Sequence, residues 1–407
     1  MDRRHFLQGL GAAFVLFPLN PLFASSLSFD DFVKQQKDGF ADYQAELDHN
    51  FKVYQQTINE EFKQFKGQVK KVWGDEKIGS STVFVQYSEN LKSRTIIDFK
   101  KGTMTVELIA AENTKGMGTR VRQLLVESAG ISVKEAYDKD PLLQKIEKRL
   151  ANQITAQAKA SLGNEPVIAD VLTGKTQPSK QQVLAAVAKA AKTGTASTRK
   201  TPQAGQKIFA FSIPLNQARI SAKSEQYKPA VKKYAKQEKI DPALVLAIMH
   251  SESAFNPLAK SYIPAYGLMQ IVPESAGKDA SEKVYGQQRL LTPAYLYNSN
   301  NNIKMGCAYL NILYYRYLSE IANKESRIYC VIAAYNTGAG NVARAFGAGT
   351  KISRAAVTIN RMSPQQVYAR LISSLPYSET RNYIKKVLPR YRAYQAVVCK
   401  RNSNPTF

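Results

Sequence analysis

The sequence is poor in the residues that usually bind metal ions or form disulfides. Its 407 residues include only three cysteines and three histidines: Cys307, Cys330, Cys399, His5, His49 and His250. No spacing typical of a zinc site occurs among them, so we expect no metal and no cofactor. Three thiols leave one without a partner, and we expect buried free cysteines in preference to a disulfide framework.

Acidic residues are also scarce. The chain has 57 Lys and Arg against 32 Asp and Glu, which gives a formal net charge of +25. A charge of this sign and size predicts attraction to a polyanion. Nucleic acid, anionic lipid and a cell-wall polymer all meet this description.

The N-terminal apolar run is too short for a comfortable membrane span. The stretch MDRRHFLQGLGAAFVLFPLNPLFASS has a basic start, a short apolar part and small residues near Ala24. This order predicts an export signal over residues 1–25 and a periplasmic protein. Arg3 and Arg4, followed by Phe6 and Leu7, resemble a twin-arginine signal in which Asp2 replaces the usual Ser or Thr.

An exported protein does not meet cytosolic nucleic acid, so the export signal argues against a role in DNA binding. The signal region has no cysteine for lipid attachment. We therefore expect no lipid anchor, and we expect any peripheral association with membrane or wall to depend on the basic surface charge.

Two domains are expected from the order of patterns along the chain. Residues 29–72 have helical spacing, and TVFVQYS, RTIIDF and TMTVELIA predict strands, with a turn at Gly102 between the last two. Further helical runs are expected around 116–128 and 141–158. The basic, Ala-rich segment 173–206 is predicted to be a helix followed by a flexible link. KIFAFSIPL is expected to return to the sheet as a strand. The fold class is thus α+β, with an α+β domain at 26–215 and a mainly helical domain at 216–407.

The helix expected from Pro242 ends in an acid. Asp241 is a good N-cap and Pro242 a good first residue, and Val245, Ile248, Met249 and Glu252 then fall on one stripe. The Glu252 carboxyl should be partly desolvated, which raises its pKa and keeps a proton available for general acid catalysis. The structural alternative is that Glu252 caps a turn or pairs with a Lys or Arg.

Three further motifs place polar groups at the ends of apolar stripes. YGLMQIVP offers the Gln270 amide beside the permissive Gly267. RIYCVIAAYNTGAG brings Tyr335 and Asn336 to a helix end, and PYSETRNYIKKVL gives Tyr383 an inward direction. Taken singly, each motif is better explained as a capped helix or a satisfied core tyrosine.

Together and in this order, ESAFNP, GLMQIVP, AYNTGAG and ETRNY resemble the lysozyme-like domain of the soluble lytic transglycosylase family. The hairpin FVQYSENLKSRTIIDFKKGTMTVELIA, ahead of such a domain, is similar to the membrane-bound lytic murein transglycosylase C family. That family's lipoprotein cysteine is missing here. The resemblance implies a lysozyme-like catalytic domain and peptidoglycan as the partner.

The resemblance also implies roles for individual residues. Glu252 would be the one catalytic acid and base, with Ser253 orienting it and the substrate. Tyr383 would hydrogen-bond near Glu252 and hold it in place. The remaining residues implied to contact the glycan are Met269, Gln270, Tyr335 and Asn336.

Glycoside cleavage normally takes two carboxylates, and no second one stands out here. One acid is enough if the muramic acid 6-hydroxyl is the nucleophile, which closes a 1,6-anhydro ring. We therefore expect a non-hydrolytic lytic transglycosylase that cleaves between N-acetylmuramic acid and N-acetylglucosamine. One rival is a hydrolytic muramidase that uses Glu274 or Asp279, and another is an inactive wall-binding protein.

Overall fold

The computed structural model describes residues 29–151, 162–261 and 264–402. The export signal expected at residues 1–25 lies outside these ranges, as does the end of the helix expected at 141–158. In the described part of the chain, no helix is both long enough and apolar enough to cross a membrane.

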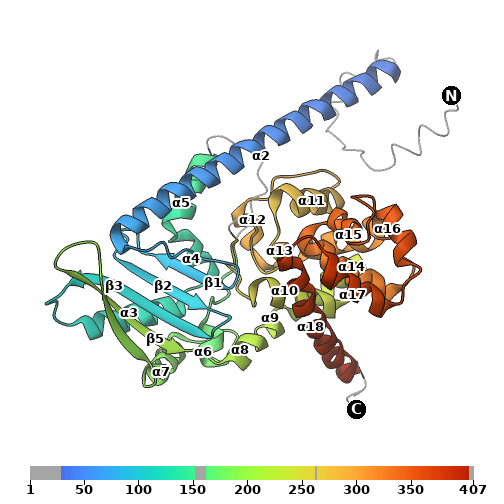
Figure 1. Cartoon of the computed structure of the whole chain (residues 1–407). Coiled ribbons are helices and arrows are strands. Elements are labelled where there is room, and N and C mark those ends of the chain that lie inside the picture. Colours follow the sequence, from blue (N-terminus) through green and yellow to red (C-terminus); the bar gives the residue numbers. More distant parts are fainter. Residues whose placement is uncertain (1–28, 152–161, 262–263, 403–407) are drawn as a thin grey trace.

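The N-terminal half combines helices with a single sheet (Figure 1). Its elements in chain order are α2 (Phe29–Trp73), β1 (Val83–Tyr87), β2 (Ser93–Asp98), β3 (Thr103–Ala111), α3 (Met117–Gly130), α4 (Val133–Asp138), α5 (Pro141–Ala151), α6 (Ala169–Thr173), α7 (Lys180–Ala191), β4 (Thr195–Lys200) and β5 (Gln206–Pro214). The five strands are antiparallel in the order β1-β2-β3-β5-β4.

The expected hairpin is confirmed as β2 and β3. Gly102 closes its turn with a φ of 68°, and the Asp98 side chain accepts a 2.8 Å hydrogen bond from the Lys101 N–H. A positive φ suits glycine because it has no Cβ to clash. The strand expected from KIFAFSIPL is also confirmed, as β5 beside β3.

The segment 173–206 is only partly as expected. Its basic helix exists as α7, which Ser179 caps through the Gln182 N–H. The flexible link is wrong, because residues 195–200 form β4 and pair with β5 along their whole length. Thr195, Thr198 and their small neighbours suit an edge strand, since its outward groups need no apolar cover.

A buried arginine joins the long helix to the sheet. Arg94 is fully buried, and its guanidinium donates to both carboxylate oxygens of Asp75 at 2.6 and 2.9 Å. Its Nε donates to Glu107 at 2.5 Å, and the group lies 4.1 Å from the centre of the Trp73 ring. Because every charge here has a partner, the cluster acts as a structural support for the end of α2.

The described residues of the C-terminal half form helices and no strand (Figure 1). In chain order they are α8 (Gln217–Ala222), α9 (Ser224–Glu238), α10 (Pro242–Ser253), the π-helix η2 (Pro273–Gly277), α11 (Lys278–Tyr285), α12 (Pro293–Tyr297), α13 (Ser299–Asn311), the π-helix η3 (Ile312–Tyr317), α14 (Lys324–Thr337), α15 (Ala339–Ala345), α16 (Ile352–Ile359), α17 (Pro364–Ser374) and α18 (Ser378–Asn402). The expected α+β class is therefore confirmed, with a mixed first half and a helical second half.

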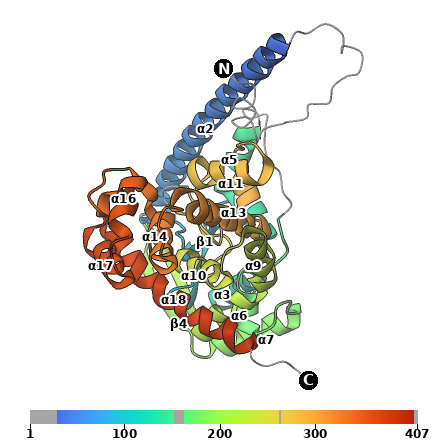
Figure 2. The same ribbon diagram turned by 90° about the vertical axis from the view of Figure 1, so that its right-hand side faces the viewer.

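The two halves are in close contact. Buried Lys223, just before α9, donates to both oxygens of Asp170 on α6, at 3.0 and 2.8 Å. The Tyr54 hydroxyl of α2 donates to the Tyr266 hydroxyl at 3.0 Å. Figures 1 and 2 show that the N-terminal part of α2 extends beyond these contacts, away from the rest of the protein.

Candidate active site

Helix α10 carries Glu252 in its last turn, and α9 and α18 pack against this helix. The helix begins as expected, since the Asp241 carboxylate accepts a 2.8 Å hydrogen bond from the Ala243 N–H and Pro242 follows. Every residue from Ala243 to Met249 is buried. The expected apolar stripe is thus part of a helix that is apolar all round, as is typical of a helix enclosed by others.

The chain turns sharply immediately after Glu252. Ala254 and Phe255 both have positive φ values, 50° and 61°, which end the helix in the left-handed region. Such a conformation costs a non-glycine residue free energy and persists where the surroundings enforce it. Here Phe255 is fully buried, and its ring centre lies 5.2 Å from that of His250.

Two cations of α18 bind the last carbonyl groups of α10. The Lys386 ammonium donates to the Ser251 carbonyl oxygen. The Arg390 guanidinium donates to the His250 carbonyl oxygen at 3.3 Å and to the Ser251 hydroxyl at 2.9 Å. Cations at this end of a helix compensate its dipole and satisfy carbonyls that have no partner within the helix. They therefore fix the turn that holds Glu252.

Glu252 is an unusual acid. Its side chain is only half-buried by surface area, so solvent still reaches it, although protein atoms crowd it closely. Desolvation raises the pKa of its carboxyl to about 7; the neighbouring Tyr383 hydroxyl and the Lys386 charge lower this pKa, and the Glu379 charge raises it. Both protonation states are therefore populated near neutral pH, which suits a group that must give and take a proton.

Tyr383 of α18 faces this carboxyl. Its hydroxyl is buried and makes no hydrogen bond of ideal geometry within the described residues, yet it interacts closely enough with Glu252 for each to shift the other's pKa. Burial raises the pKa of Tyr383 well above its usual value, and the Glu252 charge raises it further. The phenol is thus a neutral donor directed at Glu252.

The GLMQ turn adopts a conformation that only glycine allows at its first position. Gly267 has a φ of 74°, and a Cβ there would lie 2.4 Å from Asn302 Nδ2 and 2.5 Å from the Leu296 carbonyl oxygen. Buried Asn302 supports the turn by accepting from the Met269 N–H at 2.8 Å and donating to the Tyr266 carbonyl at 2.7 Å. The close approach of α13 therefore fixes the backbone that presents Gln270.

Ser253 and Tyr335 connect this turn to the helices on either side. The Ser253 hydroxyl lies 2.9 Å from the Leu268 carbonyl oxygen and 3.0 Å from that of Met249, and it can donate to either. The Tyr335 hydroxyl donates to the Met269 carbonyl oxygen at 2.8 Å. Burial raises the pKa of Tyr335, with the Glu252 charge as the next cause, so the turn, α14 and Glu252 meet at one place.

The structure assigns different surroundings to the expected substrate-binding residues. Ser253 and Met269 are fully buried, so they shape the site from beneath. Gln270 and Asn336 keep partial exposure. Gln270 Nε2 donates to the Gly267 carbonyl at 3.0 Å, and Asn336 Oδ1 accepts from the Thr380 hydroxyl at 2.7 Å. These bonds leave a Gln270 carbonyl oxygen and an Asn336 amino group to contact a ligand.

The other acids considered as partners of Glu252 have contacts of their own, although burial raises the pKa of Glu274 and its Oε1 is buried without a hydrogen bond in the described chain. The Glu274 carboxylate accepts from Gln55 of α2 at 3.4 Å, and Asp279 accepts from the Tyr317 hydroxyl at 2.8 Å. Neither is among the groups that shift the pKa of Glu252. Across residues 29–151, 162–261 and 264–402, no group of three His, Cys, Asp or Glu side chains is placed to hold a metal ion.

Sequence reasoning missed several residues that shape this site. On α18, Glu379, Tyr383, Lys386 and Arg390 follow one another at helical spacing, so extending the Tyr383 stripe in both directions would have found the other three. Asn302 gave no such signal, because it stands among other asparagines in NSNNNI. Its role depends on a contact across the fold.

Comparison with known proteins gives two family matches. Residues 229–356 match the transglycosylase SLT domain. Residues 51–170 match the N-terminal domain of membrane-bound lytic murein transglycosylase C. The first range contains Glu252, the GLMQ turn and Tyr335, and the second contains β1, β2 and β3.

Curated relatives extend over most of the chain. A membrane-bound lytic murein transglycosylase C of Actinobacillus pleuropneumoniae serotype 5b is 34% identical over 332 residues, which cover 80% of this chain and 83% of the relative. The protein of that name from Salmonella arizonae is 34% identical over 339 residues, with 82% and 88% covered. Among solved structures, the 70 kDa soluble lytic transglycosylase of Escherichia coli has a TM-score of 0.35 and 18% identity, and the match covers 70% of this chain and 44% of that one.

Proposed function

Because the chain belongs to the membrane-bound lytic murein transglycosylase C family, we propose that its Glu252 site cleaves the β-1,4 bond between N-acetylmuramic acid and N-acetylglucosamine in peptidoglycan and leaves 1,6-anhydromuramic acid ends. The observation that carries this proposal is the environment of Glu252. It is a crowded carboxyl with a pKa of about 7, and neither Glu274 nor Asp279, the two acids considered as its partner, is among the groups that shift this pKa.

Glu252 acts first as an acid. Its carboxyl donates a proton to the oxygen that joins the two sugars, and the bond from that oxygen to C1 of the muramic acid breaks. Positive charge develops on the sugar ring as the oxygen leaves. The carboxylate that forms is then stabilised by the Tyr383 hydroxyl and the Lys386 charge, which both lower the pKa of Glu252.

Glu252 then acts as a base. The carboxylate takes the proton of the muramic acid 6-hydroxyl while that oxygen bonds to C1 and closes the anhydro ring. The proton returns Glu252 to its starting state, so no water is consumed and no second acid is required. A nucleophile within the same sugar also has the advantage of proximity.

The neighbouring residues bind and orient the glycan. The Gln270 carbonyl oxygen can accept and the Asn336 amino group can donate, as the acetamido and hydroxyl groups of the sugars require. Ser253, Met269 and Tyr335 hold the backbone on which Gln270 stands. We further propose that an N-terminal signal exports the protein to the periplasm, where its substrate lies.

Substitution of each acid tests whether one carboxylate is enough. We expect Glu252→Gln to release no soluble fragments from purified peptidoglycan while it still sediments with that material. Glu274→Gln and Asp279→Asn should keep most of the activity. Loss of activity in either of these two variants, in a protein that still folds, would instead favour a hydrolytic muramidase with a second acid. A fully active Glu252→Gln protein would refute the proposal.

A further inference from the structure

A long part of the chain between the two family matches contains no acid. Between Asp170 and Glu225 the sequence has nine Lys and Arg residues and no Asp or Glu. This part includes α7, β4 and β5, and all of it falls between the matched ranges 51–170 and 229–356. The proposed catalytic site gives it no role.

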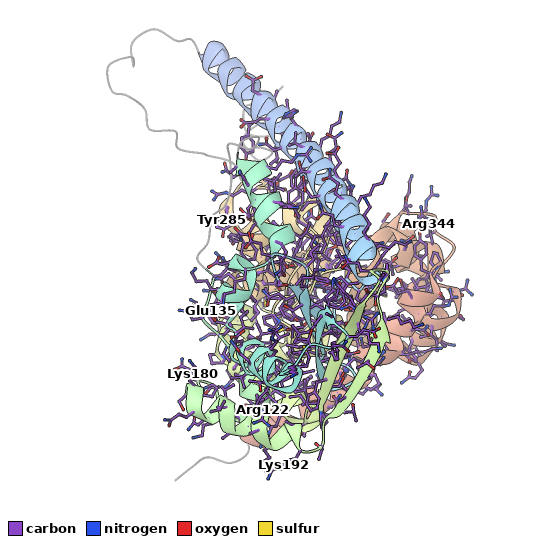
Figure 3. The ribbon with its side chains drawn as sticks, turned by 90° about the vertical axis from the view of Figure 1, so that its left-hand side faces the viewer. Arg122, Glu135, Lys180, Lys192, Tyr285 and Arg344 are labelled. Atoms are coloured by element: carbon purple, nitrogen blue, oxygen red, sulfur yellow. The ribbon has the colours of Figure 1, made fainter. Side chains whose placement is uncertain are left out.

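The structure gathers the cations of this part with those of a neighbouring helix. Helices α3 and α7 pack against each other and against the same strand, β5. Figure 3 shows Arg122 of α3 on the same side of the molecule as Lys180, the first residue of α7, and Lys192, its C-cap. The group that we call the α3–α7 basic face comprises exposed Arg120, Arg122, Lys180, Lys189 and Lys192.

These cations lack counter-charges. No Asp or Glu side chain lies within ion-pairing distance of any of the five in the described part of the chain. Helix α3 carries one acid, Glu127, and its carboxylate accepts instead from Gln123 at 2.9 Å. A surface that gathers like charges without counter-charges is unfavourable by itself and gains by binding an anion.

The strand beside this face adds hydroxyl groups. Thr195, Ser197 and Thr198 of the edge strand β4 are exposed, as is Thr193 in the turn that precedes it. Exposed large apolar side chains are nearly absent, since Leu184, at 53% exposure, is the one example among the described residues of the N-terminal half. A helix that lies in a membrane interface normally presents several large apolar or aromatic side chains. The mixture of cations and hydroxyls suits a hydrated anionic polymer better.

We propose that the α3–α7 basic face is a second peptidoglycan-binding surface, which holds the carboxylates of stem peptides on a strand other than the one being cleaved. This rests on the proposed function for the substrate class. Figure 1 shows α7 at the lower left, below the sheet, and α10, α14 and α18, which carry the Glu252 site, well to its right, so the face is separate from that site. The enzyme would thus hold the wall at one place and cleave it at another.

Two charge-matched variants test this surface. The first carries Arg122→Gln, Lys180→Gln, Lys189→Gln and Lys192→Gln. The control removes four other exposed cations without ion pairs in the described chain: Lys52, Lys63 and Lys71 of α2 and Lys236 of α9, each changed to Gln. Both sets are made in the full chain, once with native Glu252 and once with Glu252→Gln, which prevents digestion during binding. Thermal melting checks that each variant folds.

Binding is measured by sedimentation with purified insoluble peptidoglycan and, separately, with phosphatidylglycerol vesicles. Exposed ion pairs are individually weak, so we expect the four changes together to weaken peptidoglycan binding about tenfold at low salt. The control should bind like the parent, and added salt should reduce the difference. With native Glu252, both variants should cleave a short soluble glycan at the parent's rate.

Three results would overturn the proposal. They are equal peptidoglycan binding by the first variant and the parent, an equal loss in the control, and a loss confined to vesicles, which would assign the face to a membrane. Failure of the parent to cleave the soluble glycan would instead refute the proposed function, so the two failures are distinguishable.

Discussion

The Tyr335 hydroxyl donates a 2.8 Å hydrogen bond to the main-chain carbonyl oxygen of Met269. This bond joins the end of α14 to the turn that carries Gln270, and it lies beside Glu252, whose charge raises the pKa of Tyr335. The site is therefore held together by buried side-chain to backbone bonds that connect segments far apart in the sequence.

Removing this hydroxyl should weaken both stability and activity. Tyr335→Phe keeps the ring but leaves the Met269 carbonyl without its donor, at a cost of about 1 to 3 kcal/mol in the free energy of unfolding. Tyr309→Phe is the control, because that ring lies 5.6 Å from the Tyr335 ring, and its hydroxyl has no comparable backbone bond in the described chain. Urea denaturation and release of peptidoglycan fragments measure the two effects. Equal behaviour of the two variants would contradict this role.

The acid Glu252 should make stability depend on pH. Its pKa rises from 4.5 to about 7 on folding, so between these values the folded protein keeps a proton that the unfolded chain has lost. Stability from this group is therefore complete below about pH 4.5 and is lost as the pH rises to about 7. Glu252→Gln carries no such charge and should be more stable than the native protein at pH 8, by up to about 3 kcal/mol, and similar to it at pH 4. A difference that does not change with pH would contradict the raised pKa.

Two neighbouring charges should move the pH dependence of activity in opposite directions. The rate should fall as the pH rises through about 7, where Glu252 loses its proton. Lys386→Gln keeps a donor for the Ser251 carbonyl but removes a charge that lowers the pKa of Glu252, so the fall should shift to higher pH. Glu379→Gln removes a charge that raises this pKa, so the fall should shift to lower pH.

The control for this pair is Lys385→Gln, an exposed neighbour that does not shift the pKa of Glu252. It should leave the profile of rate against pH unchanged. Shifts of the same sign in Lys386→Gln and Glu379→Gln would show that these residues act through structure and not through charge.

The turn should require glycine at position 267 for two reasons: its positive φ and the lack of space for a Cβ. Gly267 and Gly286 both have a φ of 74°, but a Cβ at Gly286 would meet no atom within 4 Å, whereas at Gly267 it would meet Asn302 and Leu296. Gly286→Ala should cost about 1 to 2 kcal/mol from backbone strain alone. Gly267→Ala should cost clearly more and abolish activity. Guanidinium denaturation of both variants checks this, and equal costs would refute the close approach.

Local patterns predicted much of the fold. Asp241 and Pro242 marked the start of α10, and the alternation in TMTVELIA marked β3, because caps and strand periodicity are properties of neighbouring residues. The prediction of a flexible link in 173–206 was wrong because the structure there depends on pairing with a distant strand. Thr, Ser and Ala made residues 195–200 resemble a flexible segment, and only their pairing with β5 makes them a strand.

In the candidate site, too, local motifs could be predicted from the sequence, whereas contacts between distant segments could not. Glu252, Gln270, Tyr335 and Tyr383 stand in recognisable motifs, and the structure brings Glu252, Tyr335 and Tyr383 together. Whether a side chain faces a ligand or the core depends on packing across the fold. Ser253 is the example, because its hydroxyl is turned to backbone carbonyls that lie in a different segment.

The central claim is that the nucleophile is the substrate's own hydroxyl, and the products record this directly. Purified protein digests peptidoglycan, and mass spectrometry identifies the ends of the soluble fragments. The single-acid site around Glu252 predicts fragments that end in 1,6-anhydromuramic acid and are lighter by one water than hydrolysis products. Fragments with reducing ends would show that water is the nucleophile and would contradict the account.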